Sequence, residues 1–142
     1  MKIDRFLEGF DALNEDLGDI ATPILIPGNL DPHERHERFT RYIDAELRLT
    51  RLGSAGGGWQ IRSYDPDDEE DEGQVEYSII DTDVTELEAG LALIQHDLVE
   101  LGCPPGTLVQ YDALEDRWDG ERWNRGEART SDDDDHTPWR QA

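Results

Sequence analysis

The densest group of reactive side chains is an acidic run from Asp65 to Gly73, with the sequence DPDDEEDEG. Carboxylates are ligands for calcium, so a cation site is the first chemistry to consider. A calcium-binding EF-hand loop needs glycine at its sixth position, and Glu70 stands there when the count begins at Asp65. We therefore predict weak, non-specific attraction of cations and no metal site. The carboxylates of the run belong to Asp65, Asp67, Asp68, Glu69, Glu70, Asp71 and Glu72.

The histidines and the single cysteine indicate no catalytic machinery. His33 and His36 are three residues apart, whereas the zinc motif HExxH needs a spacing of four. Cys103 stands between a glycine and two prolines with no histidine nearby in the sequence, which predicts a buried, unreactive thiol. The sequence contains no nucleophile elbow, CxxC pair or phosphate-binding loop. It therefore predicts a protein that is not an enzyme and uses neither a metal nor a cofactor.

The chain is strongly acidic. Its 142 residues include 35 Asp plus Glu and only 13 Lys plus Arg, for a formal net charge of -22. A field of this sign repels phosphates, so direct binding of nucleic acid is excluded as a function class. Three explanations of the charge stay open: docking to a basic partner protein, mimicry of DNA by surface carboxylates, and adaptation to a salty cell interior.

The same sequence predicts a cytoplasmic protein that does not enter the membrane. No apolar stretch approaches the ~20 residues that span a bilayer. One cysteine cannot form an internal disulfide, which is typical of a reducing compartment. The first residues, MKIDRFLEGFDAL, carry acids within their apolar pattern, and this argues against a signal peptide.

The clearest structural pattern is an amphipathic helix from Asp83 to Leu101. Its apolar residues recur at spacings of four and three, which places them on one stripe. Gly102, followed by two prolines, is expected to end the helix. The stripe consists of Leu87, Leu91, Ile94, Leu98 and Leu101. The candidate capping boxes at its start are Asp83 with Glu86 and Thr85 with Glu88.

A sheet is expected around this helix. Strands predicted at 74–82 and 107–111 flank it, and a strand–helix–strand run within one sheet is a parallel crossover. Upstream, residues 43–51 alternate between apolar and polar, which predicts a strand after a short helix that ends near Arg41. A single helix over residues 33–51 is the alternative.

The fold class follows from one more predicted strand. The glycine-rich stretch Gly53–Gly58 is expected to be a hairpin loop before a strand from Trp59 to Tyr64, with Trp59 and Ile61 facing the core. The acidic run then forms the next hairpin loop. The sequence thus predicts an α+β fold with a mainly antiparallel sheet and a β-β-α-β core, as in half of a ferredoxin-like fold or a related two-layer sandwich.

The two ends of the chain add further elements. An amphipathic helix is predicted at residues 4–17, and the segment TPILIP at 22–27 is predicted to be an edge strand or an extended surface segment because proline lacks a ladder donor. We expect one domain over residues 1–125 and an acidic, disordered tail over residues 126–142.

Two tryptophans near the end of the domain are expected to face each other. Trp118 and Trp123 surround Asp119–Gly120, and Asp-Gly is a strong signal for a tight two-residue hairpin turn. Tryptophan supplies a large apolar surface with one hydrogen-bond donor, so the pair is a candidate anchor for a partner and equally a candidate for the core.

One segment of the chain resembles a known class of proteins. The stretch YSIIDTDVTELEAGLALIQHDLVELGCPPGTLVQYD is similar to small bacterial α+β proteins with a strand, a leucine-rich helix, a PPG turn and a second strand. In size and acidity the chain also resembles immunity proteins that are encoded beside bacterial toxins. The resemblance implies a non-enzymatic binder that occludes a basic toxin, commonly a nuclease, and it transfers no functional residue.

These observations give one leading hypothesis. The chain is predicted to be an immunity- or inhibitor-type protein that neutralises a basic partner protein, either a toxin or a nucleic-acid-binding protein, by occluding its positive surface. The alternatives are a DNA mimic that counters a defence system and a salt-adapted accessory domain. The expected partner-binding residues are Asp65, Asp67, Asp68, Glu69, Glu70, Asp71, Glu72, Trp118 and Trp123.

Overall fold

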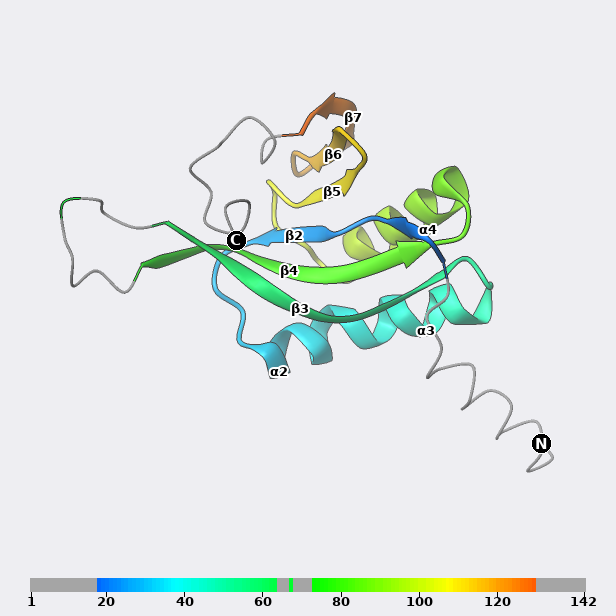
Figure 1. Ribbon diagram of the computed structural model, residues 1–142, viewed down its shortest axis with the longest axis horizontal. Helices are drawn as coiled ribbons and strands as arrows, with labels where there is room; N and C mark the ends of the chain where they lie inside the picture. Colours follow the sequence, from blue (N-terminus) through cyan, green and yellow to red (C-terminus); the bar gives the residue numbers. More distant parts are fainter. Residues whose placement is uncertain (1–17, 64–66, 68–72, 130–142) are drawn as a thin grey trace.

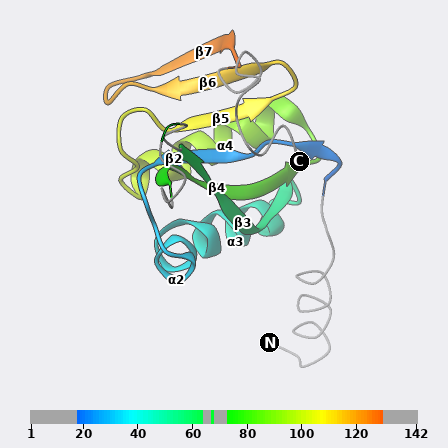
Figure 2. The same ribbon diagram turned by 60° about the vertical axis from the view of Figure 1, so that its left-hand side comes forward.

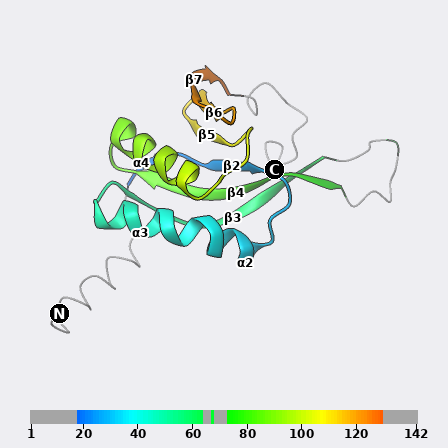
Figure 3. The same ribbon diagram turned by 180° about the vertical axis from the view of Figure 1, so that it is seen from behind.

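The computed structural model describes residues 18–63, 67 and 73–129. The predicted helix at 4–17 and the part of the predicted tail beyond Arg129 lie outside the described residues. The described part is an α+β fold in which helices cover one face of a seven-stranded sheet (Figures 1 and 3). Within it, no helix is both long and apolar enough to cross a bilayer.

The sheet is open, and each of its strand pairs is antiparallel. The strand order is β1-β4-β2-β5-β6-β7, and β3 also pairs with β4 (Figure 2). β1 and β2 pair with different parts of one side of β4, and β3 pairs with its other side. β2 lies between β4 and β5 and is antiparallel to both, so β4 and β5 run in the same direction. The predicted parallel crossover is therefore present, with one strand inserted. The strands are β1 Ile20–Ala21, β2 Ile24–Pro27, β3 Gly53–Ser63, β4 Gln74–Val84, β5 Leu108–Tyr111, β6 Leu114–Trp118 and β7 Trp123–Ala128.

The placement of β2 corrects the prediction of an edge strand. Ile24 is fully buried and pairs with strands on both sides. The Gly28 N–H donates to the Glu76 carbonyl of β4, so by the alternation of an antiparallel ladder the nitrogen of Pro27 faces the β5 side. Pairing with β5 covers only Ile24 and Leu25, and the missing donor of Pro27 therefore interrupts no ladder.

Residues 32–49 form one helical stretch, which corrects the strand predicted at 43–51. It consists of α2 (Pro32–Arg35), a π-helical segment (His36–Thr40) and α3 (Arg41–Leu49). Asp31 caps its start by accepting a hydrogen bond from the Glu34 N–H, at 2.9 Å. Ile43 and Leu47 fit an alternating pattern and a helical pattern equally, but Leu49 is 84% exposed, so the helical period is the real one.

The glycine-rich stretch Gly53–Gly58 is the first half of β3 and not the predicted loop. A Cβ atom at Gly58 would lie 2.0 Å from the carbonyl oxygen of Ile79, and the residue has φ +144. The ladder to β4 shifts register between Ala55 and Gly58, as in a β-bulge. The glycines therefore permit close backbone pairing and a bulge within the strand.

The predicted central helix is present as α4 (Leu87–Glu100). Leu91, Ile94 and Leu98 of the predicted stripe are buried. At its end the Gly102 N–H donates to Val99 O and the Cys103 N–H to Leu98 O, the pair of bonds in a Schellman motif. The predicted capping box is absent, because the N-cap residue is Glu86 and its side chain makes no capping bond.

Apolar residues gather on both faces of the sheet. The main core lies between the sheet and the helices, and it contains Phe39, Ile43, Ile80, Ile94 and Val109 among others. A smaller cluster of Leu25, Ile79 and Leu108 lies on the other face, with Ile61 and Tyr77 packed against it. The prediction that Ile61 faces the core is confirmed by its packing against this smaller cluster. The same prediction is wrong for Trp59, which is 39% exposed.

Candidate functional site

An acidic groove lies between α3 and the end of α4. It holds a cavity of about 420 Å³, a size typical of ligand pockets. Three carboxylates, one imidazole, one phenol and one leucine line it. The residues of this acidic groove are Tyr42 and Glu46 from α3 and His96, Asp97, Glu100 and Leu101 from the end of α4.

The helices place these side chains by their ordinary periodicity. Tyr42 and Glu46 are one turn apart on α3, beside the buried residues Ile43 and Leu47. The last turns of α4 carry Asp97 and Glu100, and the last turn contains no basic residue. Negative charge is unfavourable at a helix C-terminus because it faces the negative end of the macrodipole. The acids of this groove thus depart from local helix preference, which is a signal of a functional site.

Asp97 is the most unusual member of the acidic groove. Its side chain is only 5% exposed. Its Oδ2 atom has no hydrogen-bond partner among the described residues. Burial of a carboxylate without a full set of donors costs several kcal/mol in typical proteins, where such groups are paired. The Oδ2 atom is therefore a buried acceptor beside the groove that the described part of the chain leaves unsatisfied.

The surroundings of Asp97 raise its pKa to about 7. Burial is the largest cause, followed by a side-chain hydrogen bond with Glu46 and by the charge of Glu46. Glu100 also raises this pKa, and His96 lowers it. Two carboxyl groups in contact favour a shared proton, since like charges at close range do not both ionise easily. Near neutral pH, Asp97 thus changes charge with small changes of its surroundings.

A second cavity of about 450 Å³ lies beside the bulge of β3. Trp59 lines it, and the indole N–H of this residue donates to Asp81 Oδ1 at 3.4 Å. Arg48 also lines it and is held by Asp44 at 2.8 Å, and the same carboxylate oxygen accepts a bond from the Ala55 N–H. Charges of both signs occur in this cavity, so it has no strong preference for a cation or an anion.

The two tryptophans meet as the sequence predicts. Trp118 and Trp123 are paired across β6 and β7, and their ring centroids are 5.5 Å apart. Both rings are half-buried against the main core. Four residues, Asp119 to Arg122, separate the paired tryptophans, and the Asp119 N–H donates to Arg122 O across Gly120 and Glu121. An anchoring role thus stays open for the outward parts of the rings.

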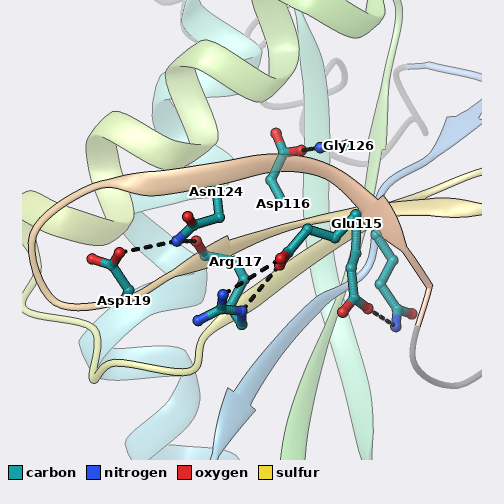
Figure 4. A network of polar contacts seen from close by, with 8 residues as sticks. Glu115, Asp116, Arg117, Asp119, Asn124 and Gly126 are labelled. Atoms are coloured by element: carbon teal, nitrogen blue, oxygen red, sulfur yellow. Dashed lines mark hydrogen bonds and ion pairs between the residues drawn. The ribbon is translucent and has the colours of Figure 1, made fainter.

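Asp119 stabilises this turn through its side chain. The carboxylate accepts hydrogen bonds from the N–H groups of Glu121 and Arg122. It also accepts one from the side-chain amide of Asn124 (Figure 4). The bonds from Arg122, Asn124 and Glu121, in that order of size, lower the pKa of Asp119 to about 2. Asp119 therefore caps the start of this tight turn with its side chain, a role that aspartate commonly has at turns.

A buried carboxylate, Asp116, joins β6 to its neighbours. It is fully buried and lies where the register of β6 and β7 shifts. It accepts hydrogen bonds from Gln95 Nε2 of α4, from the Tyr111 hydroxyl of β5 and from the Gly126 N–H of β7. Figure 4 shows Asp116 pointing to Gly126. The hydrogen bond from Arg125 Nε, at 3.3 Å, adds a positive charge. Sequence reasoning missed this residue, because Asp116 stands between Glu115 and Arg117 and such a charged run is typical of a surface segment.

Most of the acidic run lies outside the described residues. Of the predicted partner-binding residues, the structure describes Asp67, Trp118 and Trp123. The prediction that the run connects a hairpin is confirmed, since Ser63 at the end of β3 pairs with Gln74 at the start of β4. The two strand ends that the run connects are therefore neighbours in the sheet. The predicted residues outside the description are Asp65, Asp68, Glu69, Glu70, Asp71 and Glu72.

The other candidate reactive residues have ordinary surroundings. His33, His36 and His96 are exposed. The Cys103 thiol is buried in the main core, and burial raises its pKa. Among the described residues, no three His, Cys, Asp or Glu side chains are arranged to hold a metal ion. Asp97 is therefore the carboxyl group whose chemistry sets the acidic groove apart.

No family model, no curated protein and no solved structure matches the chain.

Proposed function

We propose that the chain is a cytoplasmic, non-enzymatic binding protein that neutralises a basic partner protein by covering its positive surface. The observation that carries this proposal is the distribution of charge. The net charge is -22, and seven carboxylates lie between the paired ends of β3 and β4. In Figure 1 these strand ends extend beyond the rest of the sheet. A charged segment that starts and ends there suits the electrostatic steering of a partner into contact.

The sequence resemblance supports the same proposal. The similar segment corresponds to β4, α4 and β5, which form the centre of the described fold. The resemblance implies an immunity protein that occludes a basic toxin, commonly a nuclease. Trp118 and Trp123 are half-buried, so in this proposal their outward parts serve as apolar anchors beside the steering charges.

We also infer a ferredoxin-like unit within the fold. The order of elements from β2 to β5 is strand, helix, strand, strand, helix, strand, and the spatial order of these strands is β3-β4-β2-β5. Both features agree with a split βαβ arrangement. In this interpretation β6 and β7 are an added hairpin on the β5 edge. Such a unit supports many unrelated activities, so it favours no function by itself.

The test of the function is isolation and reconstitution of the complex. We expect the tagged chain to retain a protein of high pI from its source cells, and the two purified proteins to form a complex of fixed stoichiometry. The partner should lose its activity, such as nuclease activity, within that complex. Recovery of small molecules alone, or a partner that keeps full activity in the complex, would contradict the proposal.

Replacement of the carboxylates in the acidic run is expected to slow association with the partner. With the Asp and Glu residues between Asp65 and Glu72 changed to Asn and Ser, the association rate at low salt should fall by about tenfold or more. Circular dichroism should show an unchanged fold. Stopped-flow fluorescence measures the rate, and an unchanged rate would mean that the run only aids solubility.

Stability at low ionic strength distinguishes a binder from a salt-adapted domain. A halophilic protein unfolds in dilute buffer because its carboxylates repel one another without screening. We expect this chain to stay folded at about 0.05 M salt, where the Debye length exceeds 10 Å. Thermal unfolding at low and high salt measures this property. Loss of the folded state at the lower concentration would favour salt adaptation.

A further inference from the structure

We propose that the sheet face opposite α3 and α4 is a docking surface for the chain's own C-terminal segment, residues 130–142, with Trp139 as the anchor. This docking is independent of the proposed function and requires no partner protein. We call the sheet face the open face. Its buried side chains are those of Leu25, Ile79, Leu108, Gln110 and Glu115.

The burial of the open face is the first observation. Each of its five side chains is at most 3% exposed. The helices lie on the opposite face of the sheet (Figures 1 and 3), and within the described ranges no helix lies over the open face. An antiparallel sheet face without a covering layer is ordinarily solvated. Side chains this well buried therefore indicate that a further segment lies over them.

Two of these buried side chains are polar. Gln110 shares the face of Leu108 because it follows that residue by two positions, and it is paired with Glu115 across β5 and β6. The Gln110 amide donates to Glu115 Oε1 at 3.2 Å. Glutamate is one of the residues least often found buried, and its long side chain would reach water from an uncovered sheet. The covering segment therefore extends over β5 and β6.

The opposite part of the open face is not covered. Trp59 of β3 is 39% exposed, and Asp81 of β4 and Ala21 of β1 are exposed as well. Residues 1–17 join the described part of the chain at Gly18, which lies against Val84 at the end of β4. A cover formed by that segment would protect the neighbourhood of β1 first. The pattern of burial thus favours a cover that approaches from β5 and β6.

The C-terminal segment begins on that side. The Arg129 N–H donates to Ala113 O, and its guanidinium donates to Asp112 O, so the chain leaves the described part beside the turn between β5 and β6. Trp139 is ten residues further along the chain, a reach of roughly 33 Å for an extended backbone. The four strand spacings from β7 to β4 amount to about 19 Å. The segment is therefore long enough to bring Trp139 over the whole buried patch.

The composition of the segment suits this surface. Trp139 is its one large apolar residue, and tryptophan combines a broad apolar ring with one hydrogen-bond donor. The open face offers the matching combination of three aliphatic side chains beside a polar pair. Arg140 adds a positive charge toward a face that contains Glu115. The aspartates at 132–135 serve as the linker, so the prediction of a disordered tail is replaced for its last residues.

Nuclear Overhauser spectra of the full chain with labelled methyl groups test this docking. We expect cross-peaks between the ring protons of Trp139 and the methyl groups of Leu25, Ile79 and Leu108. Trp139→Ala should abolish them and raise the fluorescence of an added hydrophobic dye by about threefold or more, because apolar surface becomes exposed. Trp59→Ala removes a tryptophan from the exposed part of the same face and should leave the Trp139 cross-peaks in place.

Three results would overturn the proposal. Methyl cross-peaks to Phe6 or Phe10 would show that the N-terminal segment is the cover. Cross-peaks that join two differently labelled copies, together with a dimer in sedimentation, would assign the cover to a second copy. Unchanged methyl shifts in Trp139→Ala would show that the C-terminal segment does not dock. None of these results bears on the neutralisation of a basic partner.

Discussion

Asp116→Ala is expected to lower the free energy of unfolding by about 3 to 5 kcal/mol, the usual cost of removing one member of a buried charged network. The substitution leaves the Gln95 amide, the Tyr111 hydroxyl and the Gly126 N–H without their common acceptor. These donors come from α4, β5 and β7, so the β6–β7 hairpin should lose its attachment to the helix layer. The loss is a large part of the 5–15 kcal/mol by which domains of this size are usually stable.

Denaturant unfolding at pH 7 measures this effect, and the near-ultraviolet signal of the tryptophans reports the hairpin. Glu121→Ala removes an exposed carboxylate from the same hairpin and should change the stability by less than about 0.5 kcal/mol. Asp116→Asn keeps the size of the side chain and one oxygen acceptor, so the stability of this variant should lie between those of the Asp116→Ala and Glu121→Ala variants. A loss of less than about 1 kcal/mol for Asp116→Ala would mean that water replaces the carboxylate and that the network does not hold the hairpin.

Asp97→Asn is expected to stabilise the protein at pH 8 by about 2 to 4 kcal/mol. Asparagine has the size of aspartate and carries no charge, and its amide is able to donate to Glu46. The pKa of Asp97 is raised from 3.8 to about 7 in the folded protein, so the folded state binds the proton more tightly than the unfolded state. The corresponding stability is fully present below about pH 4 and is lost as the pH rises through 7.

The stability difference between Asp97→Asn and the wild type should therefore grow between pH 5 and pH 8. Urea unfolding at both pH values measures it, and using the difference removes the contribution of the many other acids. Glu88→Gln serves as the exposed control and should show little dependence on pH. A difference of the same size at both pH values, or destabilisation by Asp97→Asn at pH 8, would show that the carboxyl group of Asp97 is well satisfied.

The features predictable from the sequence are those with a strong local signal. The stripe of Leu91, Ile94 and Leu98 marks α4, and Gly102 marks its end. The hairpin of β3 and β4 follows from strand patterns on both sides of a long acidic run. The pairing of Trp118 with Trp123 follows from the turn residues between them. In each of these cases the residues near one another in the sequence decide the structure.

The features that the sequence could not predict depend on distant contacts. β2 is central because β4 and β5 pair with it, and proline content alone indicated an edge. The three successive glycines of β3 lie at a register shift, where the backbone of β4 approaches Gly58 closely, and a loop pattern does not show this contact. Asp97 and Asp116 appear among 35 acids in the sequence, and only burial distinguishes them. The groove likewise exists only where α3 meets α4.

The association rate of the reconstituted complex as a function of salt tests the account most directly. For a partner attracted by a net charge of -22, we predict that the rate falls by about tenfold or more between 0.05 and 0.5 M salt, while dissociation changes little. Stopped-flow tryptophan fluorescence follows the reaction. An association rate that does not depend on salt would contradict the central claim that this acidic surface recognises a basic protein.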